Sequence, residues 1–348
     1  AHLRGLDTQQ DAGRFLAVKT RQADMLPIAR HALDLSRVPA DAVPLRILMV
    51  AGSYPPHIRG GGEISTKLLA ESLAQLGCSI RVLTCGSAPE SVSENGVTVD
   101  RRPSPNLYWN YESPRGAVRK LGWHVLENWN PRARAGVDAA LAEHRPDLVL
   151  TSSLENFGAE AWRAAHAVGI PAVHVLRSFY VLCWRGSTFR NGRNCDGRCL
   201  DCRMLSAGRR RASSTVAGVV GISRHILDRH LERGLFSAAS PAVIANPVGV
   251  DAARGAKERG APLRFGYLGV LSPNKGLELL ARAWRQSPPA DAKLLIGGSG
   301  DPGYQMQLQR EFAGTAEWRG WVESRRFLDE IDFLVVPSVW NEPFGRIV

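Results

Sequence analysis

Two charged side chains near the end of the chain have the types and the setting for chemistry on a sugar phosphate. Lys275 stands in a turn just after the apolar run 263–268, and Glu342 follows the apolar run 333–336. Ligands of parallel α/β sheets bind beyond the carboxyl ends of such strands, so both residues are predicted at a binding edge. A fixed ammonium there stabilises charge on a departing diphosphate, and a carboxylate accepts hydrogen bonds from sugar hydroxyls. The alternative for each is an exposed loop charge without a function.

A glycine-rich turn, Gly60 to Gly62, lies between a predicted strand at residues 45–50 and a predicted helix at residues 63–76. Free backbone amides and the helix dipole favour an anion at such a turn, so it is a candidate phosphate site. The spacing is not the G-x-G-x-x-G fingerprint, which argues against a dinucleotide oxidoreductase. A flexible turn without a ligand is the other interpretation of three glycines.

Four cysteines cluster with the spacing C-x11-C-x3-C-x2-C: Cys183, Cys195, Cys199 and Cys202. Four thiolates held together can bind zinc tetrahedrally, and a closing C-x2-C pair is typical of such sites. The long first spacing is a weaker signal, so an iron–sulfur cluster, disulfides and free thiols stay open. A metal here is expected to be structural and to staple the polar loop at 190–201.

Short apolar strands alternate with amphipathic helices from residue 45 onward, which is the pattern of doubly wound parallel α/β sheets. The helix at 63–76 is expected to bury Leu68, Leu69, Leu73 and Leu76 and to end at Gly77. The other elements predicted for a first sheet are strands at 79–84, 147–151, 172–175, 215–222 and 242–245 and a helix at 223–233. Those predicted for a second sheet are strands at 263–268, 293–296 and 333–336 and helices at 277–286, 304–313 and 324–331.

A chain of 348 residues is long enough for two such cores. The segment 246–262 is rich in Gly, Ala and charge, which is typical of a hinge. It separates a first domain at 45–245, which carries the cysteine loop 183–202, from a second domain at 263–348. Residues 1–44 are expected to form a helical extension. We expect the second domain to be truncated, because the chain stops soon after its last predicted strand.

The composition is that of a soluble globular protein, with 44% hydrophobic and 22% charged residues. The sequence has no apolar run of the roughly 18 residues needed to span a bilayer and no leader, which predicts a cytoplasmic location. The net charge of +11 favours anionic partners. Nucleic acid is disfavoured, because the cysteine cluster lacks interleaved aromatic residues. The densest basic stretches, 209–211 and 223–233, are either solvated helix faces or contacts to an anionic inner leaflet or a phosphorylated lipid acceptor.

Several motifs occur in the order found in family 4 glycosyltransferases, which have the GT-B fold of two Rossmann-like domains facing a cleft. The segments that carry the resemblance are the Gly60 to Gly62 loop, the Asn-Pro-Val-Gly-Val-Asp crossover at 246–251, the Gly266 to Gly276 turn, Gly297-Gly298-Ser299-Gly300, Gly320-Trp321-Val322 and Glu342-Pro343-Phe344-Gly345. The chain thus resembles that family over residues 45–348. The last segment is similar to the opening of the family's E-x7-E signature, whose second Glu would fall at position 350, beyond Val348.

This resemblance implies a retaining, metal-independent hexosyltransferase. It would move a hexose from a UDP- or GDP-hexose to a glycan or lipid-linked acceptor, in cell-envelope or exopolysaccharide biosynthesis, with no cofactor for the chemistry. The resemblance gives catalytic roles to Lys275, Glu342 and Arg346. The implied donor-binding residues are Gly60, Gly61, Gly62, Gly269, Lys275, Gly298, Trp321, Glu342, Phe344 and Gly345.

Two positions depart from the family pattern. Val270 stands where the family usually has an arginine, and Arg177 falls in the slot of a histidine that many relatives carry. Arg177 is therefore the acceptor-side candidate. These departures keep open a catalytically silent paralogue that only binds sugar nucleotides. A glycosidase is disfavoured, because the spacing identifies no pair of acids flanking a glycosidic bond.

Overall fold

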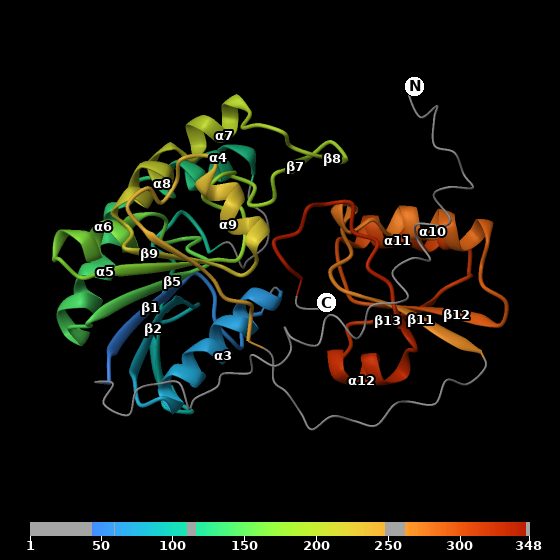
Figure 1. Cartoon of the computed structure of the whole chain (residues 1–348), viewed down its shortest axis with the longest axis horizontal. Coiled ribbons are helices and arrows are strands. Elements are labelled where there is room, and N and C mark those ends of the chain that lie inside the picture. The colour runs from blue at the N-terminus through green and yellow to red at the C-terminus, as the bar shows by residue number, and fades with distance from the viewer. Residues whose placement is uncertain (1–43, 59, 110–115, 248–261, 346–348) are drawn as a thin grey trace. The chain divides into compact units, whose positions relative to one another are not determined.

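Two β-sheets, each with its own helices, organise the chain in the computed structural model, which describes residues 44–58, 60–109, 116–247 and 262–345 (Figure 1). An eight-stranded sheet is formed within residues 46–243 and a four-stranded sheet within residues 263–334, and the parts of the chain that carry them keep the names first and second domain. The predicted α/β class with doubly wound, mostly parallel sheets is confirmed. The expected extension at 1–44 and most of the expected hinge at 246–262 lie outside the described residues.

The first sheet has the strand order β10-β9-β6-β5-β1-β2-β4-β3, and its neighbours are parallel except for the β3-β4 hairpin. Its strands are β1 (Arg46–Ala51), β2 (Ser79–Cys85), β3 (Glu90–Glu94), β4 (Val97–Arg102), β5 (Leu148–Ser152), β6 (Ala172–Leu176), β9 (Gly218–Gly221) and β10 (Ser240–Val243). The chain winds outward in both directions from β1 and β5. A topological switch point therefore lies between them, and the loops that follow these two strands are where such sheets place ligands.

The two edge strands of this sheet differ from its interior. β1, at the centre, is buried from Ile47 to Ala51. β3 is exposed along its whole length and carries a glutamate at each end, and β10 contains Pro241, which has no backbone N–H. The sequence prediction omitted β3 and β4, because the polar stretch of β3 has no apolar face to signal a strand.

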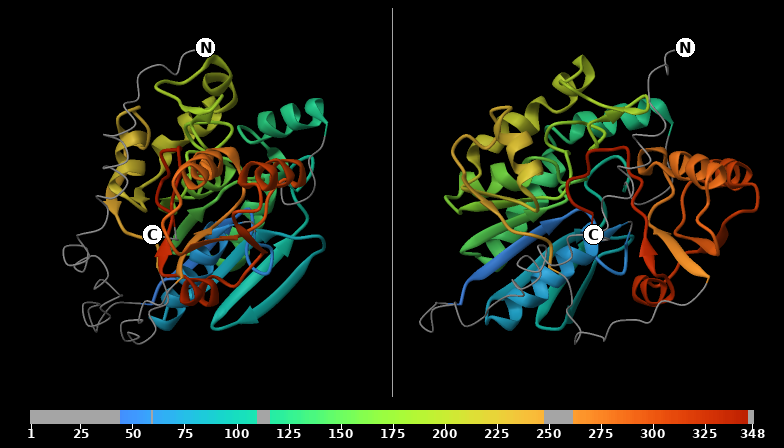
Figure 2. Two further views of the ribbon diagram at one scale, coloured as in Figure 1. Left: turned by 90° about the vertical axis from the view of Figure 1, so that its right-hand side faces the viewer. Right: turned by 45° about the vertical axis from the view of Figure 1, so that its right-hand side comes forward.

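The described helices of the first domain are α3 (Gly61–Gln75), α4 (Ala117–Leu126), α5 (Pro131–His144), α6 (Glu160–Ala167), α7 (Leu200–Leu205), α8 (Ala207–Ala212) and α9 (Arg224–Leu231). Helices α5 and α6 pack against each other beside β1 and β5 (Figure 1). Helices α4, α7 and α8 gather at one end of the domain, and Figure 2 shows the same grouping from two other sides. The hairpin β7 (Phe189–Arg190) and β8 (Arg193–Asn194) precedes α7.

Helix α3 packs differently from the prediction. Its fully buried residues are Ser65, Thr66 and Ala70, whereas the predicted leucines are only partly buried. Small side chains let the helix approach the strands closely, and the two hydroxyls donate to the carbonyls of Gly61 and Gly62, each at 2.9 Å, which offsets the cost of burying them.

Two strand predictions for the first sheet need correction, and in the second sheet the strand expected at 333–336 covers only Phe333–Leu334. The strand expected at 215–222 covers only Gly218–Gly221, because Ser213–Thr215 forms a 3-10 helix in which each hydroxyl bonds a carbonyl three residues earlier. The strand expected at 242–245 begins earlier, as Ser240–Val243.

The second domain has four parallel strands in the order β13-β12-β11-β14. They are β11 (Leu263–Leu268), β12 (Ala292–Gly297), β13 (Glu317–Gly320) and β14 (Phe333–Leu334). Helices α10 (Leu277–Gln286) and α11 (Pro302–Phe312) lie on one side of the strands and α12 (Ser324–Glu330) on the other (Figure 1). Leu280, Trp284 and Phe312 belong to the core under α10 and α11, and Phe327 and Ile331 to the smaller core under α12.

The predicted bounds of β11 and α10 are confirmed to the residue. β13 was not predicted, because its Glu-Trp-Arg-Gly sequence at a sheet edge is half polar. No described helix has the length and apolar character needed to cross a membrane.

Candidate functional site

Lys275 and Glu342 form an ion pair in the second domain, with 2.7 Å between Nζ and Oε1. Lys275 ends the 3-10 helix η4 (Pro273–Lys275) after β11, and Glu342 follows β14, the neighbouring strand. Their side chains keep only 24% and 17% of their exposure. The structure thus brings together, beyond the carboxyl ends of two adjacent strands, the two side chains that the sequence singled out.

The turn that carries Lys275 packs closely on the segment that leads to Glu342 and is hydrogen-bonded to it. Gly276 has φ of +72°, and a Cβ there would lie 2.0 Å from the carbonyl oxygen of Pro337, so the position requires glycine in both respects. The carbonyl of Asn274 accepts hydrogen bonds from Val339 N and Ser338 Oγ, both at 3.2 Å. Lys275 Nζ also lies 5.5 Å from the centroid of the Trp340 ring, within range of a cation–π contact.

The turns after β11 and β12 approach each other as closely as Gly276 approaches Pro337. A Cβ on Gly298, whose φ is +131°, would lie 1.8 Å from the carbonyl oxygen of Gly269, and one on Gly300 would lie 2.1 Å from that of Leu271. Glycine at these positions therefore allows backbone to pack on backbone, and the amides of Gly269 and Gly298 donate to the carbonyls of Gly297 and Gly320 at 3.1 and 2.6 Å.

The other implied donor residues after residue 262 lie at the same edge of this sheet. Trp321 follows β13 and is 81% exposed, and Phe344 and Gly345 follow Glu342 after β14. Val270 is exposed, and its carbonyl accepts the Tyr267 hydroxyl at 2.8 Å. Burial, and then the charge of Glu342, raise the pKa of Tyr267, so Tyr267 stays a neutral donor. Arg346 lies outside the described residues.

In the first domain, Gly60 to Gly62 begin α3 at the switch point of the sheet. The Gly60 N–H donates to the Glu63 carboxylate at 3.1 Å. Thr66 Oγ1, one turn into the helix, lies 3.4 Å from Ser152 Oγ at the end of β5. These glycines therefore occupy the predicted position after β1, and one of their amides already has an internal partner.

Arg177 joins this group from the end of β6. Its Nε donates to Ser152 Oγ at 2.9 Å, and its guanidinium also donates to the side-chain carbonyl of Asn246. The structure thus connects the acceptor-side candidate to the start of α3 through Ser152. Lys275 and Glu342 form a separate group in the second domain.

His174, three residues before Arg177, is buried and cannot serve as an exposed base. Its Nδ1 lies 2.9 Å from Thr151 Oγ1, and its ring packs on Trp162 and Phe236. Burial, and then His230, lower the pKa of His174 to about 3, so the ring is neutral at physiological pH.

The cysteine cluster is compact. Cys202 Sγ lies 3.5 Å from the sulfur of Cys183 and 3.5 Å from that of Cys199. Cys183 and Cys202 are buried, Cys195 and Cys199 are half-buried, and all four are free thiols. The spacing in the sequence therefore corresponds to proximity in the fold.

A basic pocket of about 360 Å³ lies beside this cluster, lined by Arg198, Arg203, Ala207, Arg210 and Arg211. No carboxylate lines it. Burial, and then the charges of Arg198 and Arg203, lower the pKa of Arg210, because like charges face one another there. An anion in the pocket would relieve this repulsion.

Arg209 does not belong to this basic surface, although the sequence placed it there. It is fully buried, and its guanidinium lies 3.9 Å from the centroid of the Tyr180 ring. The Tyr180 hydroxyl in turn donates to Glu127. His230 of the expected solvated helix is likewise buried, with Nδ1 2.7 Å from the carbonyl of Ile226.

Glu127 is a buried carboxylate that the sequence did not single out. It accepts hydrogen bonds from Asn106 Nδ2 at 2.6 Å and from the Asn156 amide at 2.9 Å. Burial raises the pKa of Glu127 to about 7. No pattern in the sequence distinguishes it from an exposed acid at the end of α4.

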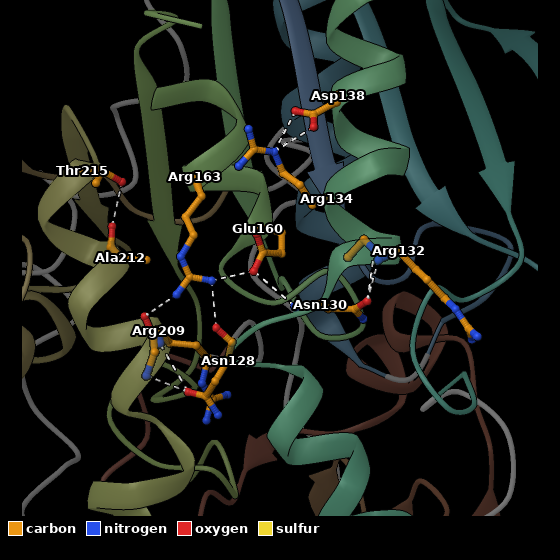
Figure 3. Close-up of polar contacts among 12 residues, drawn as sticks. Asn128, Asn130, Arg132, Arg134, Asp138, Glu160, Arg163, Arg209, Ala212 and Thr215 are labelled. Carbon is orange, nitrogen blue, oxygen red and sulfur yellow. Dashed lines mark hydrogen bonds and ion pairs between the residues drawn. The ribbon is translucent and has the colours of Figure 1, made fainter. Parts of the chain in front are cut away.

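Asn128, the next residue, anchors the arginine-rich helix α8. Its Oδ1 accepts the Gly208 amide at 2.9 Å, and Arg163 donates to the carbonyl of Asn128 at 2.8 Å and to Glu160 at 2.6 Å (Figure 3). These bonds hold α8 to α6, so the lining of the basic pocket has a fixed support.

Comparison with known proteins decides the family. Residues 60–247, more than half of the chain, match the profile described as a glycosyl transferase 4-like domain. The chain belongs to this family. Its structural neighbours are glycosyltransferases of the GT-B fold, which confirms the expected fold.

Three similar proteins extend this result. An uncharacterised 42.6 kDa protein in the cps region of Klebsiella pneumoniae is 26% identical over 310 residues, which are 87% of this chain and 82% of that protein. Sucrose-phosphate synthase from Thermosynechococcus elongatus superimposes with a TM-score of 0.62 at 17% identity, over 87% of this chain and 77% of that one. Anabaena HepE, solved with UDP and glucose, gives a TM-score of 0.58 at 17% identity with the same coverage.

The family match of this glycosyl transferase 4-like chain ends at Pro247, so it covers the first domain with Gly60 to Gly62, Arg177 and the cysteines. The second domain, with Lys275 and Glu342, lies beyond the match and is related to known proteins through the structural neighbours.

Proposed function

We propose that this protein transfers a hexose from a UDP- or GDP-hexose to a glycan or lipid-linked acceptor, with retention of anomeric configuration. The observation that supports this most directly is the Lys275–Glu342 pair at the carboxyl edge of the second sheet. A cation and an acid of that kind are what a sugar diphosphate needs, one for the phosphate oxygens and one for the sugar hydroxyls.

In this proposal Lys275 exchanges part of its contact with Glu342 for a diphosphate oxygen when the donor binds. The bond between the anomeric carbon and the diphosphate oxygen breaks, and a new bond forms from the acceptor oxygen on the same face. The acceptor proton passes to the leaving diphosphate. Lys275 stabilises the growing negative charge, with Arg346 as a second cation, and Glu342 holds the hexose by its hydroxyls.

The glycine turns at Gly269 and Gly298 are proposed to lie against the diphosphate and ribose, and exposed Trp321 to stack on the base. Phe344 and Gly345 would offer backbone amides to the sugar. A uridine donor is favoured by the neighbour HepE, which binds UDP and glucose. The relative encoded in a cps region favours a role in capsular or exopolysaccharide synthesis.

Calorimetric titration with UDP-, GDP- and ADP-hexoses, followed by a transfer assay with the hexose that binds, tests the proposal. Lys275→Ala and Glu342→Ala are expected to abolish transfer with an unchanged melting temperature. Lys293→Ala is the matched control, since Lys293 lies in the same domain at the opposite end of β12. Wild-type transfer rates in both site variants would reject these roles.

A second part of the proposal concerns the acceptor side. Helix α4 exposes Val118, Leu121 and Val125, which lie on one face at i, i+3 and i+7, and α7 exposes Leu200 and Met204. The two helices are linked through Trp184, because Lys120 and His124 of α4 both contact its ring and its indole donates to Asp201 of α7 at 3.2 Å. Apolar side chains beside an arginine pocket suit an anionic bilayer at the inner face of the membrane.

Flotation with vesicles tests this contact. The protein is expected to float with phosphatidylglycerol vesicles and not with neutral phosphatidylcholine vesicles, and Arg203→Glu with Arg211→Glu should abolish flotation. Arg282→Glu with Arg285→Glu, two exposed positions on α10 of the second domain, controls for the same change in net charge. Equal flotation of the pocket variant and the control would reject the surface.

A catalytically silent, nucleotide-binding protein is the second candidate function, and the exposed Val270 at the family's arginine position favours it. The same experiments separate the two. Calorimetric binding without turnover in the presence of cell-envelope acceptors would select the silent protein, and Val270→Arg would then be expected to tighten donor binding.

A further inference from the structure

The four cysteines of the loop come from two segments that lie against each other, one at Cys183 and one running from Cys195 to Cys202. Cys183 precedes a tight turn closed by the Gly186 N–H on the Cys183 carbonyl at 2.9 Å, and Cys195 follows the β7-β8 hairpin. Cys199 is the N-cap of α7, and Cys202 lies in its first turn. Residues 183–202 have little apolar core of their own, so the two segments are joined by the sulfur contacts and by the contacts of Asp201 with Trp184 and Arg190.

Cys195, rather than Asp201, completes the set of four. Asp201 has a carboxylate oxygen within 4.8 Å of the sulfurs of Cys199 and Cys202. Its oxygens are already engaged, however: Oδ1 accepts the Cys202 amide at 2.9 Å, and Oδ2 accepts the Trp184 indole at 3.2 Å and lies 3.5 Å from Arg190. Cys195 is held at the end of the hairpin by its N–H on the carbonyl of Thr188 at 2.8 Å, and its free, half-buried thiol has no comparable oxygen or nitrogen partner among the described contacts.

From this geometry we propose that Cys183, Cys195, Cys199 and Cys202 bind one Zn²⁺ as a tetrahedral four-thiolate site, with Asp201 as an outer hydrogen-bond acceptor. Zn–S bonds of about 2.3 Å in a tetrahedron place sulfurs roughly 3.8 Å apart, close to the 3.5 Å seen from Cys202 to its two neighbours. An iron–sulfur cluster would insert its own iron and sulfide ions and spread the thiolates further.

The site has a consequence for the surface beside it. Arg198 lies between Cys195 and Cys199, and Arg203 follows Cys202 directly, so both line the basic pocket from positions next to the ligands. The metal is therefore expected to hold these two arginines in place. It is structural, and it lies in a different domain from Lys275 and Glu342.

Elemental analysis of the purified full chain tests the proposal directly. One zinc per chain is expected, with neither iron nor sulfide, and four of the six thiols should react with a thiol reagent only when a chelator is added to the denaturant. Cobalt(II) supplied in place of zinc should give the intense sulfur-to-metal charge-transfer absorption of a tetrahedral thiolate site. Iron with sulfide, a disulfide in the protein isolated under reducing conditions, or a chain without metal would each overturn it.

Variants identify the ligands and guard against misfolding. Cys195→Ser, at a half-buried position, is expected to lower zinc affinity by at least tenfold in competition with a chelating dye, whereas Asp201→Asn should still purify with one zinc. Cys78→Ser, a half-buried thiol outside the cluster, is the control and should leave zinc content unchanged. Zinc lost from Asp201→Asn and kept by Cys195→Ser would reject the four-thiolate set. Circular dichroism and donor binding by the second domain report whether each variant is folded.

Discussion

Replacing Gly276 by alanine should destabilise the second domain far more than the same change at a glycine with equal backbone geometry and open space. Gly276 and Gly314 have φ of +72° and +78°, but a Cβ would meet the Pro337 carbonyl oxygen at 2.0 Å in the first and no atom within 4 Å in the second. At either site the left-handed conformation itself costs alanine about 1–2 kcal/mol. Only Gly276→Ala also requires the 337 carbonyl to retreat.

The extra loss in unfolding free energy follows from the hydrogen bonds made by the residues next to that carbonyl. Moving it from 2.0 Å to the 3.0 Å below which real contacts do not occur displaces residues 337–339. This displacement disrupts the hydrogen bonds from Ser338 Oγ and Val339 N to the Asn274 carbonyl. At about 1 kcal/mol for each bond, Gly276→Ala should cost about 3–4 kcal/mol against about 1–2 kcal/mol for Gly314→Ala.

Urea unfolding followed by tryptophan fluorescence measures both losses, and calorimetry with the nucleotide sugar reads out the site. Gly276→Ala should also weaken donor binding, because the turn carries Lys275, whereas Gly314→Ala should not. Equal losses of unfolding free energy in the two variants would refute the argument, since it rests on the close contact alone. Unchanged donor affinity in a folded Gly276→Ala protein would separate the turn from the site.

Three other variants test further features. The folded-state pKa of Glu127 is about 7, above the ordinary 4.5, so this carboxyl contributes stability that is complete below pH 4.5 and is lost as the pH rises through 7. The free energy of unfolding should fall by about 3 kcal/mol over this range. Glu127→Gln should abolish this pH dependence, which urea unfolding at pH 5 and pH 8 measures. The same pH dependence in the variant and the wild type would contradict the assignment. Trp321→Ala should weaken nucleotide binding by about threefold to tenfold through lost stacking and leave the melting temperature unchanged, as calorimetry and thermal unfolding would show. Arg177→Ala should raise KM for the acceptor without changing the calorimetric Kd of the donor, and an effect on the donor alone would remove its acceptor-side role.

The elements that the sequence predicted best are those with strong local signals. α10 has one apolar stripe, with Leu277, Leu280, Ala281 and Trp284 buried, and a left-handed Gly276 in front of it, so its bounds could be read from the chain. The strands β3 and β13 could not, because edge strands gain much of their stability from backbone pairing with a neighbour, which leaves no mark on side-chain pattern.

The candidate site likewise has features that the sequence predicted and features that it did not. Lys275 and Glu342 each stood out through local motifs, but their contact across 67 residues depends on the pairing of β11 with β14. The burial of Arg209 was missed for a simpler reason: three consecutive arginines on a helix point in directions about 100° apart, so one of them faces the core. Charge counting along the sequence cannot say which one.

The two edges of the first sheet bear on how this enzyme can assemble. A sheet is extended when the free N–H and C=O groups of an edge strand form hydrogen bonds with a strand of another chain. Here the edge strand β10 contains Pro241, which has no N–H to donate. The other edge strand, β3, begins with Glu90 and ends with Glu94, which already pair with Arg101 and Lys67. A strand from a second copy would lack one hydrogen-bond donor at β10 and would face a row of polar side chains at β3. Association of this domain through sheet extension is therefore disfavoured, and any self-association is expected to use helical faces and to leave the ligand-binding ends of the strands free.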